Sequence, residues 1–215
     1  MHLLITGVSR GIGLALAVQA LARGWDVTGT VRRAGASPAG VREIVADMQE
    51  VERLHSLGAE IAPVDVLINN AGVIGPARQS ALDVDFAGFA ETLRVNTLAP
   101  LAMAQAVVPA MQAGGRILTL SSQMAWMGYA KSDRIAYRAS KAAVNKLMQG
   151  LATDLRPRGI AVVLIDPGWV RTDMGGPQAE EDPQLVAAGI LDIAAREGLD
   201  DTGRFLRWTG EERDF

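Results

Sequence analysis

Short apolar runs recur along the chain, and longer stretches with helical periodicity separate most of them. Apolar runs of strand length bounded by turn residues are typical of buried strands. Their alternation with helical stretches predicts a parallel sheet covered by helices. The runs that we expect to form strands are Leu3–Thr6, Asp26–Val31, Val41–Ala46, Val64–Asn69, Arg116–Ser121, Ala161–Ile165 and Arg204–Trp208.

The same periodicity predicts three long helices between these strands. The first begins near Gly11 and ends at Gly24, a residue type suited to a helix C-terminus. A second long helix covers Phe89 to Met111, and a third runs from about Arg134 to Leu155. The last of these ends before Pro157, because proline cannot continue helical hydrogen bonding.

The connection between the second and third predicted strands is unusually short. It holds only the nine residues from Arg32 to Gly40, with glycine, serine and proline among them. A helix that crosses between parallel strands needs about a dozen residues or more in total. We therefore expect the second helix of the alternation to be shortened or absent, which leaves that flank of the sheet open. An ordered two-turn helix at residues 34–40 would refute this expectation.

Composition narrows the classes of protein that remain. A chain of 215 residues with 49% hydrophobic residues and no internal linker or repeat fits one globular domain, residues 1–215. The net charge of −3 gives no electrostatic attraction to nucleic acid or to an anionic membrane. The absence of cysteine excludes disulfides, thiolate metal sites and cysteine nucleophiles. No signal-like or membrane-spanning run stands out, so we expect a cytoplasmic protein.

A glycine-rich segment, Thr6-Gly7-Val8-Ser9-Arg10-Gly11-Ile12-Gly13, follows the first predicted strand and opens the first helix. Glycines at 7, 11 and 13 allow a tight turn and a close approach of the backbone to a ligand. A pyrophosphate would then lie against the helix N-terminus, where unpaired N–H groups and the helix dipole favour an anion. A strand-to-helix turn without a ligand is the alternative for this segment taken alone.

The end of the second predicted strand indicates which dinucleotide is preferred. Folds that prefer NAD place an acidic residue there to bind the adenosine ribose, whereas this chain reads Thr30-Val31-Arg32-Arg33. Together with Arg10, two or three cations are available for a 2′-phosphate, and arginine binds phosphate in a bidentate manner. The pattern favours NADP(H) and leaves NAD(H) possible. Solvated surface arginines are the alternative.

Tyr137 and Lys141 are four residues apart early in the predicted helix from Arg134. That spacing places both side chains on one helix face. A free tyrosine titrates near pH 10 and must shift by roughly three units, or about 4 kcal/mol, to exchange protons near neutrality. A cation about 4 Å away contributes about 4 kcal/mol at an effective dielectric constant of ~20. We therefore expect Lys141 to lower the pKa of Tyr137. Two ordinary surface residues are the alternative for the pair alone.

Taken together, these segments resemble the classical short-chain dehydrogenase/reductase family over nearly the whole chain. The resemblance implies a single Rossmann-type domain, an α/β fold with a doubly wound parallel seven-stranded sheet and helices on both faces. The segments that carry it are Thr6–Gly13 (TGxxxGIG), Asn69-Asn70-Ala71-Gly72 (NNAG), Tyr137–Lys141 (YxxxK) and Asp166-Pro167-Gly168 (the PG turn).

The resemblance also implies residue roles. Tyr137 is the acid/base, and a serine after the fifth strand binds the substrate oxygen; Ser121 and Ser122 compete for this role, and the family pattern favours Ser122. Lys141 holds the nicotinamide ribose, and Asn96 holds a water that relays protons to Lys141, with a helix-bending core asparagine as the alternative. The cofactor-binding residues implied are Gly7, Ser9, Arg10, Gly11, Ile12, Gly13, Arg32, Asp47, Asn70, Ala71, Gly72, Tyr137, Lys141, Pro167, Gly168, Val170 and Thr172. Asp47 lies on the adenine side and Thr172 contacts the carboxamide.

The implied function is NADP(H)-dependent hydride transfer between nicotinamide and a small-molecule carbonyl or alcohol, with no metal. The segment from Pro167 to Pro177 is similar to the C-factor-like branch of carbonyl reductases. Residues that follow Ser122, among them Trp126 and Tyr129, are expected to form an apolar substrate wall or a subunit contact. Family members often pair through the helices that correspond to residues 89–111 and 134–155, which implies a homodimer. A non-catalytic nucleotide-binding sensor or signalling protein is the alternative function.

Overall fold

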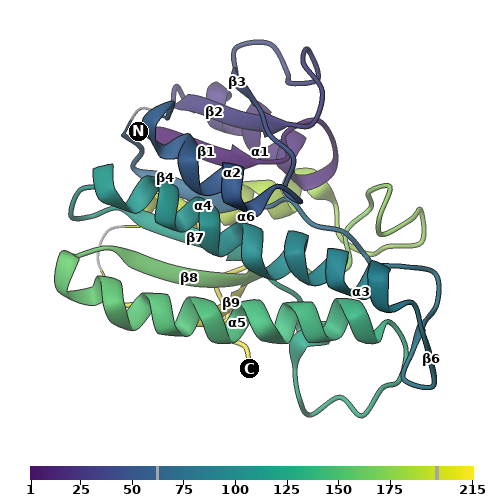
Figure 1. Cartoon of the computed structure of the whole chain (residues 1–215). Coiled ribbons are helices and arrows are strands. Elements are labelled where there is room, and N and C mark those ends of the chain that lie inside the picture. The colour runs from purple at the N-terminus through teal and green to yellow at the C-terminus, as the bar shows by residue number, and fades with distance from the viewer. Residues whose placement is uncertain (62, 197–198) are drawn as a thin grey trace.

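Seven parallel strands form one sheet in the computed structural model, which describes residues 1–61, 63–196 and 199–215 (Figure 1). Their order across the sheet is β3-β2-β1-β4-β7-β8-β9. Their bounds are β1 (His2–Thr6), β2 (Asp26–Val31), β3 (Arg42–Val45), β4 (Val66–Asn69), β7 (Arg116–Leu120), β8 (Ala161–Asp166) and β9 (Phe205–Arg207). All seven predicted strands are confirmed, with ends shifted by at most two residues.

Helices cover both faces of the sheet, as predicted (Figure 1). Alternate strand residues point to opposite faces, so Leu3 and Ile5 pack in one core cluster and Leu4 packs in the other. The first cluster includes residues of α1 (Gly11–Ala22) and α6 (Pro183–Ala195). The second includes residues of α2 (Val51–Ser56), α4 (Ala99–Val107) and α5 (Ile135–Leu155). This three-layer arrangement is the doubly wound α/β fold.

The connection between β2 and β3 contains no helix, as its length predicted. The carboxylate of Glu43 holds this loop by accepting hydrogen bonds from the backbone N–H groups of Gly35, at 2.8 Å, and Ser37, at 3.0 Å. These bonds, the one from Gly35 above all, lower the pKa of Glu43. A single side chain on β3 therefore fixes the loop that begins with Arg32.

The prediction of one continuous helix from Phe89 to Met111 is wrong. It is replaced by α3 (Phe86–Leu93), a π-helical turn at Arg94–Leu98 and α4, followed by a 3-10 turn at Val108–Ala110. Pro100, at the start of α4, has no N–H to donate to the carbonyl four residues earlier, which belongs to Asn96. The helical register changes at this point, and π turns of this kind are frequent at functional sites.

A short antiparallel hairpin, β5 (Gln79–Ser80) and β6 (Asp83–Val84), precedes α3 and was not predicted. It lies at the end of the molecule where the loop between β8 and α6 and the loop before α5 also project (Figure 1). Strands of two residues are too short to give a periodic sequence signal. Within the described ranges, no helix is long and apolar enough to cross a membrane.

Candidate active site

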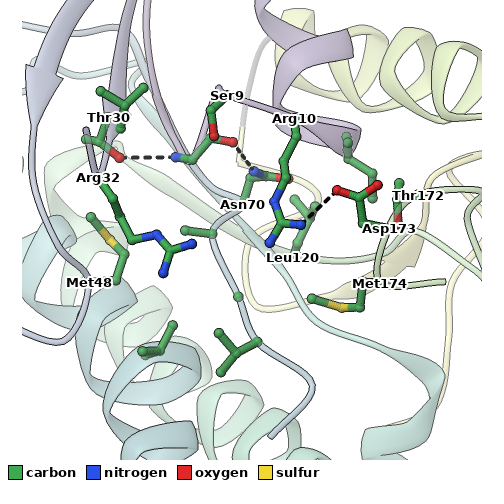
Figure 2. Close-up of a pocket in the computed structure, with 18 of the residues that line it drawn as sticks. Ser9, Arg10, Thr30, Arg32, Met48, Asn70, Leu120, Thr172, Asp173 and Met174 are labelled. Atoms are coloured by element: carbon green, nitrogen blue, oxygen red, sulfur yellow. Dashed lines mark hydrogen bonds and ion pairs between the residues drawn. The ribbon is translucent and has the colours of Figure 1, made fainter. Parts of the chain in front are cut away.

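A groove runs along the carboxyl ends of the strands, where β1 and β4 lie side by side. The chain winds away in opposite directions from these two strands, and ligands of doubly wound folds bind at such a switch point. The groove is lined by residues at or after the ends of β1, β2, β3, β4, β7 and β8 (Figure 2). Two residues of α5, Tyr137 and Lys141, also line it. Segments far apart in the sequence thus meet at one edge of the sheet.

The glycine-rich loop forms one wall of this groove. Gly7 and Gly11 have positive φ angles of 75° and 57°, which a side chain rarely adopts. A Cβ at Gly13 would lie 2.1 Å from the carbonyl oxygen of Gly7 and 2.5 Å from Nδ2 of Asn70. Asn70 also donates hydrogen bonds to the carbonyls of Thr6 and Gly7, which hold the loop against β4. Gly13 therefore serves close packing beside the groove.

The N-terminus of α1 opens onto the groove without a capping side chain. Arg10, at the N-cap position, makes no side-chain hydrogen bond to the helix, and the first intrahelical bond is donated by the N–H of Leu14. The N–H groups of the first turn are thus left for an external acceptor, and the helix dipole makes an anion the favoured one. This geometry fits the pyrophosphate of a dinucleotide.

The three arginines that the sequence offered for a 2′-phosphate are in different situations. Arg32 lines the groove and has no hydrogen bond or ion pair within the described part of the chain (Figure 2). Arg10 also lines the groove, but its Nη1 lies 2.8 Å from Oδ2 of Asp173. Arg33 is exposed and does not line the groove. The structure therefore separates three cations that the sequence groups together, and leaves Arg32 as a free guanidinium.

The remaining candidates for cofactor binding fall into two groups. Those that line the groove with the residues already described are Ser9, Ile12, Asp47, Asn70, Ala71, Gly72, Pro167 and Thr172. Thr172 also touches the glycine loop, since a Cβ at Gly11 would lie 3.3 Å from its Cγ2. Val170 is instead buried in the core, and Gly168 forms the turn with a φ of 73°. These two residues shape the turn behind the groove.

Tyr137 and Lys141 both reach the groove from α5. Lys141 is buried, its Nζ lies 5.7 Å from the centroid of the Tyr137 ring, and it donates a hydrogen bond of 2.7 Å to the carbonyl of Leu120. Burial disfavours the ammonium form and lowers the pKa of Lys141 to about 8. The predicted juxtaposition of the two side chains is therefore present.

The pKa of Tyr137 shifts in the direction opposite to our expectation. Desolvation of the half-buried phenol, the largest cause, and the charge of Asp166 raise it, and the net pKa of Tyr137 is about 12. A hydrogen bond with Ser122 and the charge of Arg134 lower it in part. The spacing of Tyr137 and Lys141 indicates a nearby cation, but the burial of the phenol depends on the tertiary fold and outweighs the effect of that cation.

The two serines after β7, Ser121 and Ser122, have side chains with different neighbours. Ser121 is buried and donates a hydrogen bond to Oδ1 of Asn145 inside the protein. Ser122 is the N-cap of the 3-10 turn at Gln123–Ala125, and its hydroxyl is the one that reaches Tyr137. Ser121 also lines the groove, whereas Ser122 is the serine next to Tyr137, so the assignment of Ser122 as the residue that binds the substrate oxygen stays a prediction.

Asn96 lies in the π-helical turn and is buried beneath the groove. Its Nδ2 donates to the carbonyl of Val73, at 2.8 Å, and to Oγ of Ser140, at 3.0 Å, while its Oδ1 accepts from the N–H of Val73. A Cβ at Gly72 would lie 3.2 Å from this Oδ1 and 3.7 Å from Nζ of Lys141. Asn96, from the π-helical turn, and Lys141, from α5, therefore both lie close to Gly72.

Two contacts of the site were not expected from the sequence. Gln79, on the unpredicted hairpin, accepts a hydrogen bond from the backbone N–H of Tyr137 through its Oε1. Asp166, at the end of β8, accepts one from the N–H of Gln123, next to Ser122. Asp166 belongs to the PG-turn motif, but neither its burial nor this contact is visible in that motif.

With the groove and its residues in place, the comparison with known proteins identifies the family. The family model of short chain dehydrogenases matches residues 1–183. The chain therefore belongs to the short chain dehydrogenase family, a family of oxidoreductases.

Individual relatives share most of the chain. The C-signal protein of Myxococcus xanthus is 43% identical over 155 residues, which cover 70% of this chain and 92% of the relative. A short-chain dehydrogenase/reductase from Burkholderia multivorans, solved with bound NADP, has a TM-score of 0.88 and 31% identity, with 100% of this chain and 99% of that chain covered. The NADPH-bound carbonyl reductase from chicken fatty liver has a TM-score of 0.88 and 25% identity, with coverage of 100% and 98%.

Proposed function

We propose that this protein is an NADP(H)-dependent oxidoreductase that reduces the carbonyl group of a small molecule, with Tyr137 as the proton donor. One observation carries the proposal. Tyr137, whose pKa is lowered in part by the nearby hydroxyl of Ser122, shares the groove with Lys141, the uncapped N-terminus of α1 and the guanidinium of Arg32, which has no partner among the described residues. The groove thus combines a candidate proton donor with two groups that could bind the phosphates of a dinucleotide.

The residues of the groove fit NADP(H). The N–H groups at the start of α1 would hold the pyrophosphate, and Arg32 would bind the 2′-phosphate. Asp47 and Met48 lie at the end that would take the adenine, and Thr172 faces the glycine loop at the other end. The NADP-bound and NADPH-bound structures of similar proteins support this choice. NAD(H) would bind the same groove without the contact to Arg32.

When bound, the cofactor supplies the hydride that is added to the carbonyl carbon. Ser122 would donate a hydrogen bond to the carbonyl oxygen, and Tyr137 would transfer its phenolic proton to that oxygen. A pKa near 12 keeps the hydroxyl of Tyr137 protonated at neutral pH, so the donor is ready for reduction. Lys141 would hold the ribose, stabilise the phenolate that remains and pass a proton on to it, and Asn96 would position a water that then returns a proton to Lys141.

A non-catalytic signalling protein is the second candidate function. Its support is the similarity to a relative that is itself named C-signal. Such a protein would retain cofactor binding but would show no turnover. Tyr137 and Lys141 line the groove, Ser122 lies close to Tyr137 and Asn96 is buried beside Gly72, and this set favours the enzyme because a binding protein has no use for a proton donor.

The substrate surface and the assembly are also proposals. Trp126, Met127 and Tyr129 are exposed in the segment between Ser122 and α5, which supports an apolar carbonyl compound as substrate. We propose a homodimer through α4 and α5, because members of the family often pair through the corresponding helices. Residence in the cytoplasm remains a prediction from the cysteine-free, mildly acidic composition.

The proposal is tested by following oxidation of NADPH with a panel of aldehydes, ketones and quinones. Tyr137→Phe is expected to lower kcat/KM at least about a hundredfold without loss of NADPH binding, because only the transferable proton is removed. Tyr129→Phe removes the chain's other phenolic hydroxyl and is expected to keep nearly full activity. Equal rates for wild type and Tyr137→Phe would contradict the role of Tyr137, and NADPH binding without any turnover would favour the signalling protein.

A further inference from the structure

The end of the described chain folds back against the catalytic end of β8. After β9, a turn closed by a hydrogen bond from Gly210 N–H to the Arg207 carbonyl reverses the chain, and Glu212 pairs with Leu206 in antiparallel fashion. The N–H of Arg213 then donates to the carbonyl of Phe205, at 2.7 Å. This return segment brings the side chain of Arg213 to Asp166.

Asp166 is a buried carboxylate that takes part in no step of the proposed chemistry, although its charge is one of the causes that raise the pKa of Tyr137. Its side chain is 2% exposed, and its Oδ2 lies 3.3 Å from Nε of Arg213, whose side chain is 29% exposed. Among the described residues, neither atom has a conventional hydrogen-bond partner, so each is the other's nearest electrostatic complement. Burying a carboxylate is costly unless a counter-charge accompanies it. Arg213 supplies that charge from the far end of the chain.

The other oxygen of Asp166 joins two parts of the active site. Oδ1 accepts hydrogen bonds from the N–H of Gln123, at 3.2 Å, and from the N–H of Gly168, at 3.1 Å. The first of these follows Ser122 directly, and the second lies in the turn that carries Pro167 into the groove. One carboxylate therefore fixes the spacing between the segment that would bind the carbonyl oxygen and the turn beside the cofactor groove.

A second ion pair from the same return segment holds the opposite side of this turn. Arg207 donates from Nη2 to Oε1 of Glu181, and this side chain packs on Gly168, where a Cβ would lie 3.0 Å from its Cγ. Glu181 is joined to the turn by backbone hydrogen bonds with Trp169 and Arg171. The turn after β8 is thus held on two sides by arginines from the end of the chain.

We infer that Arg213 and Asp166 form a positioning pair that sets the distance between Ser122 and the turn at Gly168, and thereby controls the rate of hydride transfer. The inference rests on the proposed reductase function. Neither residue touches the reacting atoms, so each acts through the backbone that it holds. Displacements of about 1 Å in a reacting geometry are enough to slow catalysis as much as a hundredfold.

The test compares Arg213→Gln, Asp166→Asn and the double variant. Arg213→Gln leaves an uncompensated buried carboxylate and is expected to lower kcat at least about tenfold with little change in the KM for NADPH. The double variant replaces the carboxylate by an amide, whose oxygen still accepts both N–H groups, and is expected to recover most of the lost kcat. Arg204→Gln is the matched control, because Arg204 directly precedes β9, is itself half exposed, and pairs with Asp201 and Glu212 and not with Asp166.

Several results would overturn the inference. One such result is a folded Arg213→Gln variant with the same kcat as Arg204→Gln. Another is a double variant, Arg213→Gln with Asp166→Asn, whose kcat is as low as that of Arg213→Gln alone. If Arg213→Gln does not fold, Asp166→Ala and Asp166→Asn decide, since only alanine removes the acceptor of the two N–H groups. Equal kcat in these two variants would contradict the inference.

A readout that needs no turnover separates this inference from the proposed function. Hydrogen exchange at the amides of Gln123 and Gly168 is expected to speed up in Asp166→Ala relative to Asp166→Asn, because only the alanine variant lacks the acceptor. If wild-type protein shows no turnover, the reductase proposal fails even when these amides behave as expected. Turnover in wild type with unchanged exchange in Asp166→Ala contradicts the positioning pair alone.

Discussion

Preference for NADPH over NADH is expected to depend on Arg32, and the structure sets the size of the effect. The guanidinium lines the groove, is exposed, and has no partner within the described part of the chain. Two unit charges about 4 Å apart interact by about 1 kcal/mol in water and about 4 kcal/mol at an effective dielectric constant of ~20. An intermediate value of about 2 kcal/mol corresponds to about 30-fold in Kd. Arg10 adds less, because Asp173 already pairs with it.

The assay is fluorescence titration of NADPH and NADH into wild type, Arg32→Gln and Arg33→Gln. Glutamine at 32 keeps length and polarity but removes the charge, so NADPH is expected to bind about 30-fold more weakly while NADH changes less than about threefold. Arg33→Gln makes the same charge change one residue away, outside the groove, and is the control. The NADPH effect should shrink at high salt, because exposed charges are screened. Equal NADPH affinity in the two variants would refute the assignment of Arg32.

Two further predictions concern stability. Gly13→Ala places a Cβ 2.1 Å from the Gly7 carbonyl oxygen, so we expect the free energy of unfolding measured in urea to fall by about 3 kcal/mol or more. Gly150→Ala has open space around its Cβ and is expected to leave this free energy unchanged or to raise it. Equal stability of the two variants would contradict the packing role of Gly13. Burial lowers the pKa of Lys141 from 10.5 to about 8, so the unfolded state binds more protons between these values and the free energy of unfolding gains a contribution that rises with pH. Between pH 8 and 9.5 this contribution is about 2 kcal/mol, and Lys141→Met is expected to lack it. The same pH dependence in wild type and Lys141→Met would show that Lys141 is not desolvated.

Much of the fold was predictable because a sheet buried on both faces needs continuous apolar runs. The seven strands and the missing helix after Arg32 follow from run lengths and from the number of residues between runs. The break in the predicted helix from Phe89 to Met111 also had a sequence signal, Pro100, which the apolar periodicity outweighed. The hairpin at Gln79 had none, because its strands are too short to repeat a pattern.

In the candidate site, too, features fixed by local sequence were predictable and features that depend on the tertiary fold were not. Tyr137 and Lys141 were predictable as neighbours because one helix fixes their spacing. The direction of the tyrosine pKa shift was not, because desolvation depends on what the fold packs around the phenol. The pairing of Asp166 with Arg213 was equally hidden, since these residues come together only through the turn after β9.

The most direct test of the central claim is to follow the transferred hydride itself. NADPH that carries deuterium at the transferable position of the nicotinamide is incubated with wild-type protein and a carbonyl compound that it reduces, and the product is examined by mass spectrometry and NMR. Direct hydride transfer predicts an alcohol with one deuterium on the carbinol carbon, formed at least about a hundred times more slowly by Tyr137→Phe. Consumption of NADPH without deuterium on that carbon, or equal rates for the two proteins, would contradict it.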